Sequence, residues 1–592
     1  MQKTYLVLLV TAFLVACKQP APEEEGKNSQ VPLKKLLEQY YEERLRYYPL
    51  EATAIADSRY NDLLPADVSN SYRDTLKAFY KRYADQVSKI DRLQLATQDR
   101  ISYDVFKREM EIQQEALGFN SNLMPMQQFW GMHLTFAQLG SGSGNQPFKT
   151  SKDYDDFLKR MMSFAAYQDT VIAYMKRGME LGYTQPRALM LKVLPQLSGV
   201  VKKDVKESVF YLPVKNMPAD LSDADKKRLT QAYTEAIEKW INPTYTKLYD
   251  FVEKEYLPKC RNTAGISEVP GGNDYYKHLA KQWTTTDITP EQIFETGQKE
   301  VARLRGEMEK VKNETGYTGD LKSFFHYIHT DKKFMPFKTD EEVIAAYRNI
   351  ETRMQPQLKK LFNLVPKAKF EVRQTEAYRE ASASAEYNQA APDGSRPGIF
   401  YVPIIDATTF NNVSMEDLFL HEAIPGHHYQ ISLQQENESL PKFRRFGWYG
   451  AYGEGWALYT ESLGKELGLY TDPYQYFGSL SEEMHRAIRL VVDVGLHTKG
   501  WTREQAIQFS LDNETESEAD IIAEVERYMA SPGQALAYKI GQMKIIELRK
   551  KAEQMLGDKF NIQKFHDEVL VNGCLPLDVF ESHMVQWMNS MN

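Results

Sequence analysis

The sequence predicts a mainly α-helical protein with a small β-sheet near the middle of the chain. Apolar residues recur at 3.6-residue spacing from Leu33 onward, and strand-like stretches are few. The chain has 592 residues, 42% of them hydrophobic, which is enough to bury a large core. A large helical enzyme often folds as one body with two lobes. We therefore expect a helical body over residues 33–592, divided near Gly271-Gly272 into an N-terminal lobe (33–271) and a lobe that carries the chemistry (272–592).

The first 32 residues differ from this body. An apolar run from Tyr5 to Ala16 is typical of a secretory signal, and Leu14-Val15-Ala16-Cys17 matches the bacterial lipobox. We expect residues 1–16 to be removed, Cys17 to be lipidated, and the polar residues 17–32 to form a disordered tether. The alternative is an ordinary signal peptide with a chance cysteine. The lipobox predicts a cell-envelope lipoprotein, on the outer membrane and facing the periplasm or the exterior.

Charge and cysteine content exclude several classes of protein. The net charge is -8 and no basic stripe is present, which argues against binding to nucleic acid. After residue 17 no apolar run is long enough to span a membrane, so the lipid is the only expected membrane contact. Cys260 and Cys574 alone remain after processing. They form no disulfide framework, and the sequence leaves open whether they pair, as it does the oligomeric state.

Individual elements follow from local signals. Leu33 to Leu45 place their apolar residues on one helical face. Thr289-Pro290 predicts an N-cap with proline at the first helical position, and Thr339 to Glu342 a capping box. Two strands are expected, at 370–373 and 398–402, the second after a turn-rich segment.

Three of the 11 histidines fall within the eight residues His421-Glu422-Ala423-Ile424-Pro425-Gly426-His427-His428. A capping box of Ser414 and Asp417 predicts the helix that delivers the first of them. A His-Glu pair on a helix with a second His nearby is the zincin arrangement, in which imidazoles bind the metal and the Glu faces the attacking water. We therefore expect His421 to bind Zn²⁺ and Glu422 to act as general base.

The spacing departs from the usual H-E-x-x-H, because Pro425 stands four residues after His421. Proline cannot donate the helical hydrogen bond and Gly426 adds freedom, so we expect the helix to kink or restart here. On an undistorted helix His427 would lie about 240° around from His421, and His428 roughly 10 Å along the axis. A kink is required for either to share the metal, and geometry leaves the choice open.

A second helix offers the third ligand. Glu454 and Glu461 are seven residues apart within Gly453 to Glu461, and thus on one helical face. Glu454 follows His427 by 27 residues (454 − 427), enough for a loop and an antiparallel return. That is the gluzincin layout, in which a second helix presents a glutamate to the metal. We expect Glu454 to bind the metal and Glu461 to orient a ligand histidine.

The two motifs, His421 to Gln430 and Glu454 to Glu461, together resemble the bacterial family known as DUF885. The resemblance runs over most of the chain from Leu33 and includes Arg396-Pro397-Gly398, Arg489 to His497, and Tyr528 to Ala535 with Tyr538. It implies a large helical two-lobed zincin-like metallopeptidase of gluzincin type, with a small β-sheet at the active-site cleft. It also implies His427 as the second ligand, with His428 beside the ligands.

The resemblance further implies residues that assist the reaction. Tyr538 and His497 become candidate catalytic donors to the developing oxyanion, and Arg489 and Tyr528 candidate substrate contacts. The strand at 398–402 resembles the edge strand on which zincins bind an extended peptide, which implies Tyr401 in substrate binding. The alternative for each residue is an ordinary structural role, since the chain has 36 tyrosines.

These patterns predict zinc-dependent hydrolysis of peptides at the bacterial cell envelope. The sequence leaves open the peptide sequence and whether cleavage is internal or terminal. One alternative is a catalytically inactive zinc-containing lipoprotein that binds peptides, but binding alone needs no general base such as Glu422. The other is a structural lipoprotein stabilised by zinc. Three protein ligands, with the fourth position open, favour catalysis over it.

Overall fold

The computed structural model describes residues 27–376, 384–392, 394 and 396–591. The expected signal peptide (1–16), Cys17 and most of the tether lie outside the described residues. The tether is shorter than expected, because helix α1 (Lys27–Tyr47) begins within it. The apolar face that starts at Leu33 anchors this helix, and adding residues to an established helix costs little free energy.

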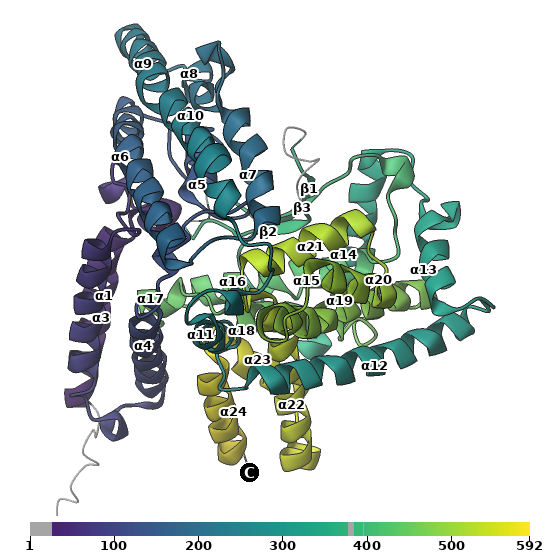
Figure 1. Cartoon of the computed structure of the whole chain (residues 1–592). Coiled ribbons are helices and arrows are strands. Elements are labelled where there is room, and N and C mark those ends of the chain that lie inside the picture. Colours follow the sequence, from purple (N-terminus) through teal and green to yellow (C-terminus); the bar gives the residue numbers. More distant parts are fainter. Residues whose placement is uncertain (1–26, 377–383, 393, 395, 592) are drawn as a thin grey trace, which may run out of the picture.

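In the described part of the N-terminal half, residues 27–271, all named elements are helices (Figure 1). They are α1, α2 (Pro49–Ala54), α3 (Asn70–Val87), α4 (Thr97–Ala116), α5 (Met132–Gly140), α6 (Ser151–Leu181), α7 (Arg187–Val200), α8 (Leu212–Lys215), α9 (Asp223–Ala236) and α10 (Asn242–Phe251). Three apolar clusters hold them together: one around α1, α3 and α4, a small one between α1 and α2, and one around α5 to α10.

The second half contains the remaining helices and the sheet. Four helices precede the strands: α11 (Gly272–Thr284), α12 (Pro290–Glu314), α13 (Leu321–Thr330) and α14 (Asp340–Leu361). Ten follow them: α15 (Met415–Glu422), α16 (His427–Glu436), α17 (Lys442–Arg445), α18 (Gly450–Glu461), α19 (Pro473–Thr498), α20 (Arg503–Asn513), α21 (Glu518–Ala530), α22 (Ala537–Leu556), α23 (Ile562–Val571) and α24 (Leu577–Met591). The mainly helical class is confirmed.

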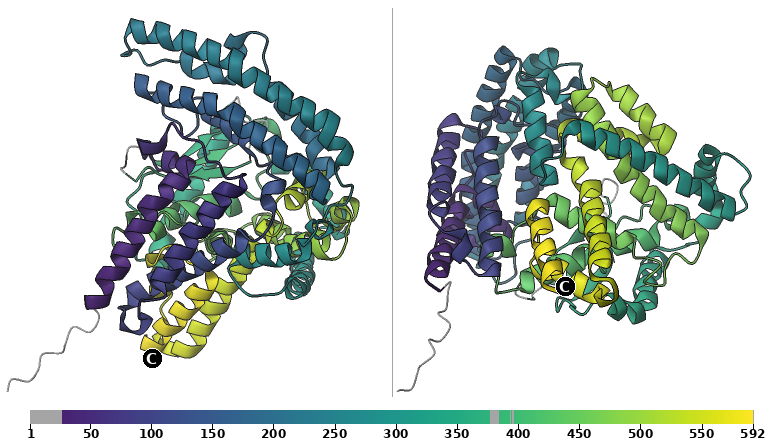
Figure 2. Two further views of the ribbon diagram at one scale, coloured as in Figure 1. Left: turned by 60° about the vertical axis from the view of Figure 1, so that its left-hand side comes forward. Right: turned by 90° about the horizontal axis from the view of Figure 1, so that it is seen from below.

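The apolar clusters of the second half begin a few residues before the expected boundary, at Ala264, Ile266 and Val269, and they also take in two residues of α4 and one of α7. Ile101 and Val105 of α4 belong to the large cluster that also contains the sheet, and Leu189 of α7 to the cluster around α12 and α19. Figure 2 shows α4 running beside the C-terminal helices. Arg108 of α4 is paired there with Asp578 of α24 at 2.9 Å. The division into two lobes therefore stays a prediction.

The predicted helix starts are confirmed, but one predicted capping interaction is wrong. Thr289 and Gln292 form a complete capping box at the start of α12, and Thr339 caps α14 by accepting from the backbone N–H of Glu342. Ser414 makes no capping hydrogen bond to α15. Asp417, its expected partner, is buried and instead accepts a hydrogen bond from the Tyr470 hydroxyl at 2.9 Å.

The sheet has three strands in the order β1-β3-β2, with β1 (Phe370–Gln374) parallel and β2 (Glu386–Asn388) antiparallel to β3 (Gly398–Val402). Both strands predicted from the sequence are confirmed. The expectation that 398–402 is an edge strand is wrong. All five residues of β3 are buried, as an unbroken apolar run predicts for a central strand, and pairing on both sides leaves its backbone no room for a peptide.

No described helix is at once long enough and apolar enough to cross a bilayer.

Candidate metal centre

The predicted break in the histidine-bearing helix is confirmed. Helix α15 ends at Glu422 and α16 begins at His427, and the four residues between them include a cis peptide bond at Ile424–Pro425. Gly426 permits the close approach of the two helix ends, because a Cβ there would lie 1.9 Å from the backbone oxygen of His421. The restart brings the rings of His421 and His427 to a centroid distance of 4.9 Å.

Helix α18 packs against this break and stabilises it. The indole N–H of Trp456 donates to the carbonyl of Pro425 at 2.9 Å, and the Thr460 hydroxyl to that of Leu420 at 2.9 Å. Both side chains are fully buried. A broken helix leaves buried carbonyls without partners, and α18 supplies those partners.

The side chains of His421, His427 and Glu454 converge. Each offers one ligand atom, and the three atoms lie within 4.8 Å of one another, the one such group among the described residues. A carboxylate oxygen of Glu454 is 3.7 Å from Nε2 of His421 and 3.4 Å from Nε2 of His427. Ligands bound tetrahedrally to zinc at about 2.0–2.1 Å stand roughly 3.4 Å apart. The donor types and their spacing therefore fit a zinc ion.

Glu461 lies behind the first ligand, as predicted. One of its carboxylate oxygens is 2.6 Å from Nδ1 of His421, and both residues are buried. This contact makes Nδ1 the protonated nitrogen and leaves Nε2 to face Glu454. Burial raises the pKa of Glu461 well above its usual value, although Arg486 opposes the rise. The arrangement orients the imidazole as metal-binding histidines require.

Glu422 stands beside the three ligands and is not one of them. Its Oε1 is 4.0 Å from Nε2 of His421, and its side chain is 13% exposed, more than that of His421 at 4%. Negative charge on Glu454 is favoured despite burial, because His427 and His421 lower the pKa of that carboxyl group far below its usual range. The position of Glu422 suits a base that reaches a water at the metal without binding the metal.

His428 faces the sheet. Its Nδ1 is 3.0 Å from the hydroxyl of Tyr387 in β2, and its ring packs against Phe370 of β1. Burial lowers the pKa of His428 to about 4. Gly398 accommodates this contact, since a Cβ there would lie 2.7 Å from the same nitrogen. The expectation that His428 supports the ligands is corrected: consecutive residues on a helix point about 100° apart, and this one ties α16 to the sheet.

Tyr538 lies near the candidate ligand Glu454. Helices α18 and α22 touch at Gly455 and Gly541, where a Cβ on either residue would collide with the backbone of the other helix. Tyr538 lies one turn before Gly541, and Glu454 is next to Gly455, so the two side chains share one region. Burial and the negative charge of Glu454 raise the pKa of Tyr538, which keeps its hydroxyl protonated.

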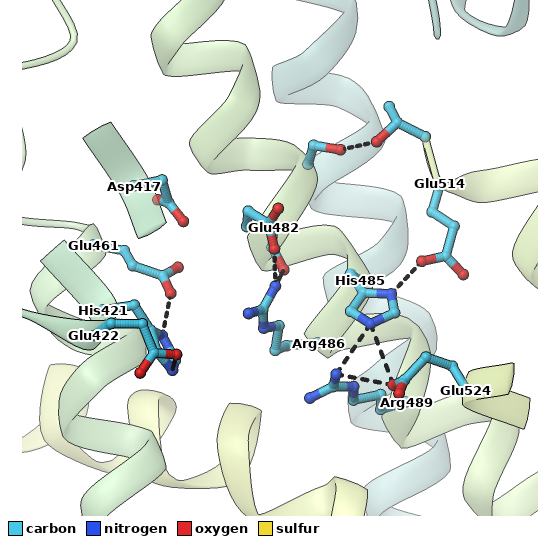
Figure 3. A network of polar contacts seen from close by, with 12 residues as sticks. Asp417, His421, Glu422, Glu461, Glu482, His485, Arg486, Arg489, Glu514 and Glu524 are labelled. Carbon is cyan, nitrogen blue, oxygen red and sulfur yellow. Dashed lines mark hydrogen bonds and ion pairs between the residues drawn. The ribbon is translucent and has the colours of Figure 1, made fainter. Parts of the chain in front are cut away.

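Arg489 and Tyr528 belong to a second polar cluster. Figure 3 shows Arg489 there with other residues of α19, with Glu524 of α21 and with Glu514, which follows α20. Nε of Arg489 donates to the Tyr528 hydroxyl at 3.2 Å, and Nη2 contacts Glu524 at 3.0 Å. The guanidinium group stacks on the ring of Tyr538 at 4.6 Å. Tyr528 is 2% exposed and its hydroxyl also donates to Glu524, so it holds Arg489 in place and leaves Arg489 as the possible substrate contact.

His497 is not part of the metal centre. Its Nδ1 accepts from the backbone N–H of Ile266 at 3.0 Å, and its Nε2 contacts the carbonyl of Tyr528 at 3.0 Å. The ring is fully buried, and burial lowers its pKa to about 3. The expectation of a catalytic His497 is therefore corrected: both ring nitrogens bind backbone groups, and none is left for a substrate.

Tyr401 occupies the middle of the sheet, opposite Arg373 of β1 and Glu386 of β2. It is 9% exposed and its hydroxyl is a hydrogen-bond partner of Arg373. Its backbone is paired on both sides, so any role in substrate binding depends on its side chain and stays a prediction.

Sequence reasoning named Arg489 but missed the other three members of a charged stripe on α19. Glu482, His485, Arg486 and Arg489 follow one another at helical spacing on a helix whose other residues are mostly buried and apolar. Arg486 is paired with Glu482, and His485 with Glu514 (Figure 3). Four charged or titratable residues on one face of an apolar helix are a signal that a closer reading of the sequence could have used.

A cavity approaches the ligands from the N-terminal half. It measures about 350 Å³ and lies between α1 and the segment from Phe443 to Tyr449. Trp448 lines it, and the ring of Trp448 is 5.9 Å from that of His427. A larger cavity of about 790 Å³ is also lined by residues of α1 and α2, and it extends to Gln389 and Arg396. Neither cavity is lined by the ligands themselves, so Trp448 separates this space from the metal centre.

Two solved structures of other bacterial proteins have a similar fold. A solved structure from Colwellia psychrerythraea, described as a candidate lipoprotein, matches with a TM-score of 0.87 and 28% identity, covering 95% of this chain and 99% of that chain. Another from Shewanella oneidensis, described as a candidate lipoprotein of unknown function, shares the fold with a TM-score of 0.74 and 20% identity, covering 93% and 99%. No curated protein matches. The family model described as a bacterial protein of unknown function, DUF885, matches residues 49–584, and the chain belongs to that family.

Proposed function

We propose that this protein is a zinc-dependent peptidase of gluzincin type, anchored in the bacterial cell envelope. The observation that carries the proposal is the convergence of His421, His427 and Glu454, with Glu422 beside them. Three protein ligands leave a fourth tetrahedral position open, as in catalytic zinc sites. When bound, zinc would polarise the scissile carbonyl and lower the pKa of water.

The residues around the ligands have distinct proposed roles. Glu422 takes the proton from the attacking water and passes it to the leaving amine. Tyr538 donates a hydrogen bond to the oxygen of the scissile carbonyl as negative charge develops there, since its raised pKa keeps the hydroxyl protonated. Glu461 fixes the orientation of His421.

The proposed location rests on the lipobox at Cys17. The two solved structures described as candidate lipoproteins support it. Peptides in the envelope would be the substrates.

The main rival is an inactive protein that binds zinc and captures peptides. Such a protein would need the three metal ligands but no general base. Glu422 favours catalysis, because it sits 4.0 Å from a ligand nitrogen without serving as a ligand. A structural zinc would instead be expected to have four protein ligands, and the described residues contain three.

The test is to incubate the purified protein with a peptide library in three states: as isolated, after chelator, and after chelator with zinc restored. We expect cleavage in the first and third states and none in the second, with about one zinc per chain. The proposal fails if the zinc-loaded protein cleaves no peptide, and also if chelator leaves cleavage unchanged.

A further inference from the structure

Arg489 has one buried donor without a partner. Its side chain is 8% exposed, yet only Nε and Nη2 are bonded, to Tyr528 and Glu524, while Nη2 also contacts His485 at 3.0 Å. Nη1 is buried and has no hydrogen-bond partner among the residues that the structure describes. Burying a guanidinium N–H that has no hydrogen-bond partner costs folding free energy, unless an acceptor binds that N–H.

The cluster around Arg489 also lacks one negative charge. Glu514 raises the pKa of His485 to about 9, against the opposing effect of burial, so this histidine is protonated near neutral pH. His485, Arg489 and Arg527 then carry three positive charges, and Glu514 and Glu524 two negative ones. A surplus cation in a buried cluster requires an anion.

Neighbouring groups do not supply that charge. Glu482 is held by its own pair with Arg486. Glu516 faces the same cluster, but burial raises its pKa to about 7, so it is only partly ionised near neutral pH. Asp493, which interacts with Arg527, is also only partly ionised, because burial raises its pKa to about 7. An anion from outside the chain would complete the charge balance.

Arg489 is linked to the candidate metal centre through Tyr538. The ring of Tyr538 stacks on its guanidinium group at 4.6 Å, and the same tyrosine is within electrostatic reach of Glu454. Figure 3 shows Arg489 extending from α19 on the side where His421 and Glu422 lie. One tyrosine therefore contacts Arg489 and also interacts electrostatically with Glu454, a candidate metal ligand.

We propose that Arg489 binds the C-terminal carboxylate of the peptide substrate, so that the chain is cleaved near its C-terminus. The inference rests on the proposed peptidase function and adds the end of the substrate that is recognised. A guanidinium group with a free N–H is the preferred partner of a carboxylate, and the aromatic face of Tyr538 fixes its plane. The bound carboxylate would accept a hydrogen bond from Nη1 and balance the surplus positive charge of the cluster.

The test measures binding apart from hydrolysis. Two pools of mixed pentapeptides, one with free C-terminal carboxylates and one with C-terminal amides, compete for the zinc-loaded Glu422→Gln protein, which binds without turnover. The same measurement is made with Glu422→Gln/Arg489→Gln and with Glu422→Gln/Arg489→Lys, which keeps the charge. Glu422→Gln/Arg503→Gln is the control, because Arg503 is paired with Glu526 outside the cluster.

We expect the acid pool to bind about 10- to 100-fold more tightly than the amide pool, the range for a hydrogen bond between charged groups. Arg489→Gln should abolish that preference, Arg489→Lys should keep part of it, and Arg503→Gln should leave it unchanged. Equal binding of the two pools, or binding of neither, overturns the inference. Acid pools with and without Asp and Glu side chains separate the terminal carboxylate from side-chain carboxylates: a preference that follows the side chains also overturns it.

The active protein separates this inference from the peptidase proposal. With the acid pool, products shortened from the C-terminus are expected by mass spectrometry, and Arg489→Gln should raise KM more than it lowers kcat. If both pools are cleaved equally, the peptidase proposal stands and the carboxylate site falls. If neither pool is cleaved but the acid preference in binding persists, the site stands and the peptidase proposal falls.

Discussion

The carboxylate of Glu461 lies 2.6 Å from Nδ1 of His421, while Nε2 of the same ring faces Glu454 at 3.7 Å. Glu461 of α18 therefore orients the ring of His421 through Nδ1, and Glu454 of the same helix faces Nε2 on the other side of the ring. Because Glu454 and Glu461 are two turns apart on one face, α18 alone fixes both the carboxylate ligand and the direction of the imidazole.

Replacing Glu461 by alanine should weaken zinc binding by roughly 10- to 100-fold, the usual cost of losing the group that orients a ligand histidine. Glu461→Gln can still accept a hydrogen bond and should weaken it less. The measurement is the zinc Kd, by competition with a chelating dye. Glu466→Gln, an exposed residue paired with Arg549, is the control. An unchanged Kd in Glu461→Ala contradicts the orienting role.

The two neighbouring histidines should behave differently. His427→Ala removes a ligand and should lose most of the bound zinc. His428→Ala should retain zinc, because its ring contacts Tyr387 and Phe370 in the sheet, but it should lower the midpoint of thermal unfolding. Metal analysis of both variants at equal concentration decides the matter, and zinc loss confined to His428→Ala would reassign the ligand.

The break between α15 and α16 was predictable, because Pro425 and Gly426 act through local backbone chemistry. The choice between His427 and His428 was not. It depends on Tyr387, which lies 41 residues earlier in β2, a strand of three residues with no apolar pattern. Local signals cannot reveal a partner that only the tertiary fold brings near.

The same limit explains the other corrections. The apolar run of β3 indicates a strand buried on both faces, but the strands that pair with it on both sides come from segments that the run itself does not identify. His497 looked available in the sequence, but the backbone groups of Ile266 and Tyr528 that bind its ring come from distant segments. Asp417 was expected to help cap α15, yet it accepts a hydrogen bond from the hydroxyl of Tyr470, which follows α18 in the chain.

Acid should destabilise the protein through His497. Its folded pKa is about 3, below the usual 6.5, so below pH 6.5 the unfolded chain binds a proton that the folded chain does not. Stability from this residue is complete above pH 6.5 and is lost as the pH falls toward 3. His497→Gln lacks this titration. Between pH 7.5 and 4.5, the free energy of unfolding of the parent should fall by roughly 2 to 3 kcal/mol more than that of the variant.

Urea unfolding at the two pH values checks the prediction, with zinc present throughout. Parallel losses in parent and variant would mean that His497 is not the buried neutral group described. Hydrolysis by His497→Gln at neutral pH, once a peptide is known, is expected to persist, since the ring reaches no substrate.

The anchor is expected at Cys17. Cys17→Ser removes the site of acylation, so the protein should leave the membrane fraction or remain unprocessed with its signal peptide. Fractionation of cells with a salt wash, followed by mass measurement of the N-terminus, checks this. A variant that is processed and still sediments with membranes after the wash contradicts the lipobox interpretation.

The enzymatic proposal depends most on Glu422, which stands 4.0 Å from a ligand nitrogen and outside the ligand set. Glu422→Gln keeps the shape of the side chain but cannot accept the proton of the attacking water. Zinc content and folding should stay near those of the parent, while hydrolysis falls by roughly two to four orders of magnitude, the range for losing a general base. Glu454→Gln is the matched comparison, because it removes a charged ligand and should lose zinc together with activity. Zinc stoichiometry and turnover are measured on both variants with one cleavable peptide. Parent-like turnover in Glu422→Gln would remove the general base from the mechanism and favour the peptide-binding protein instead.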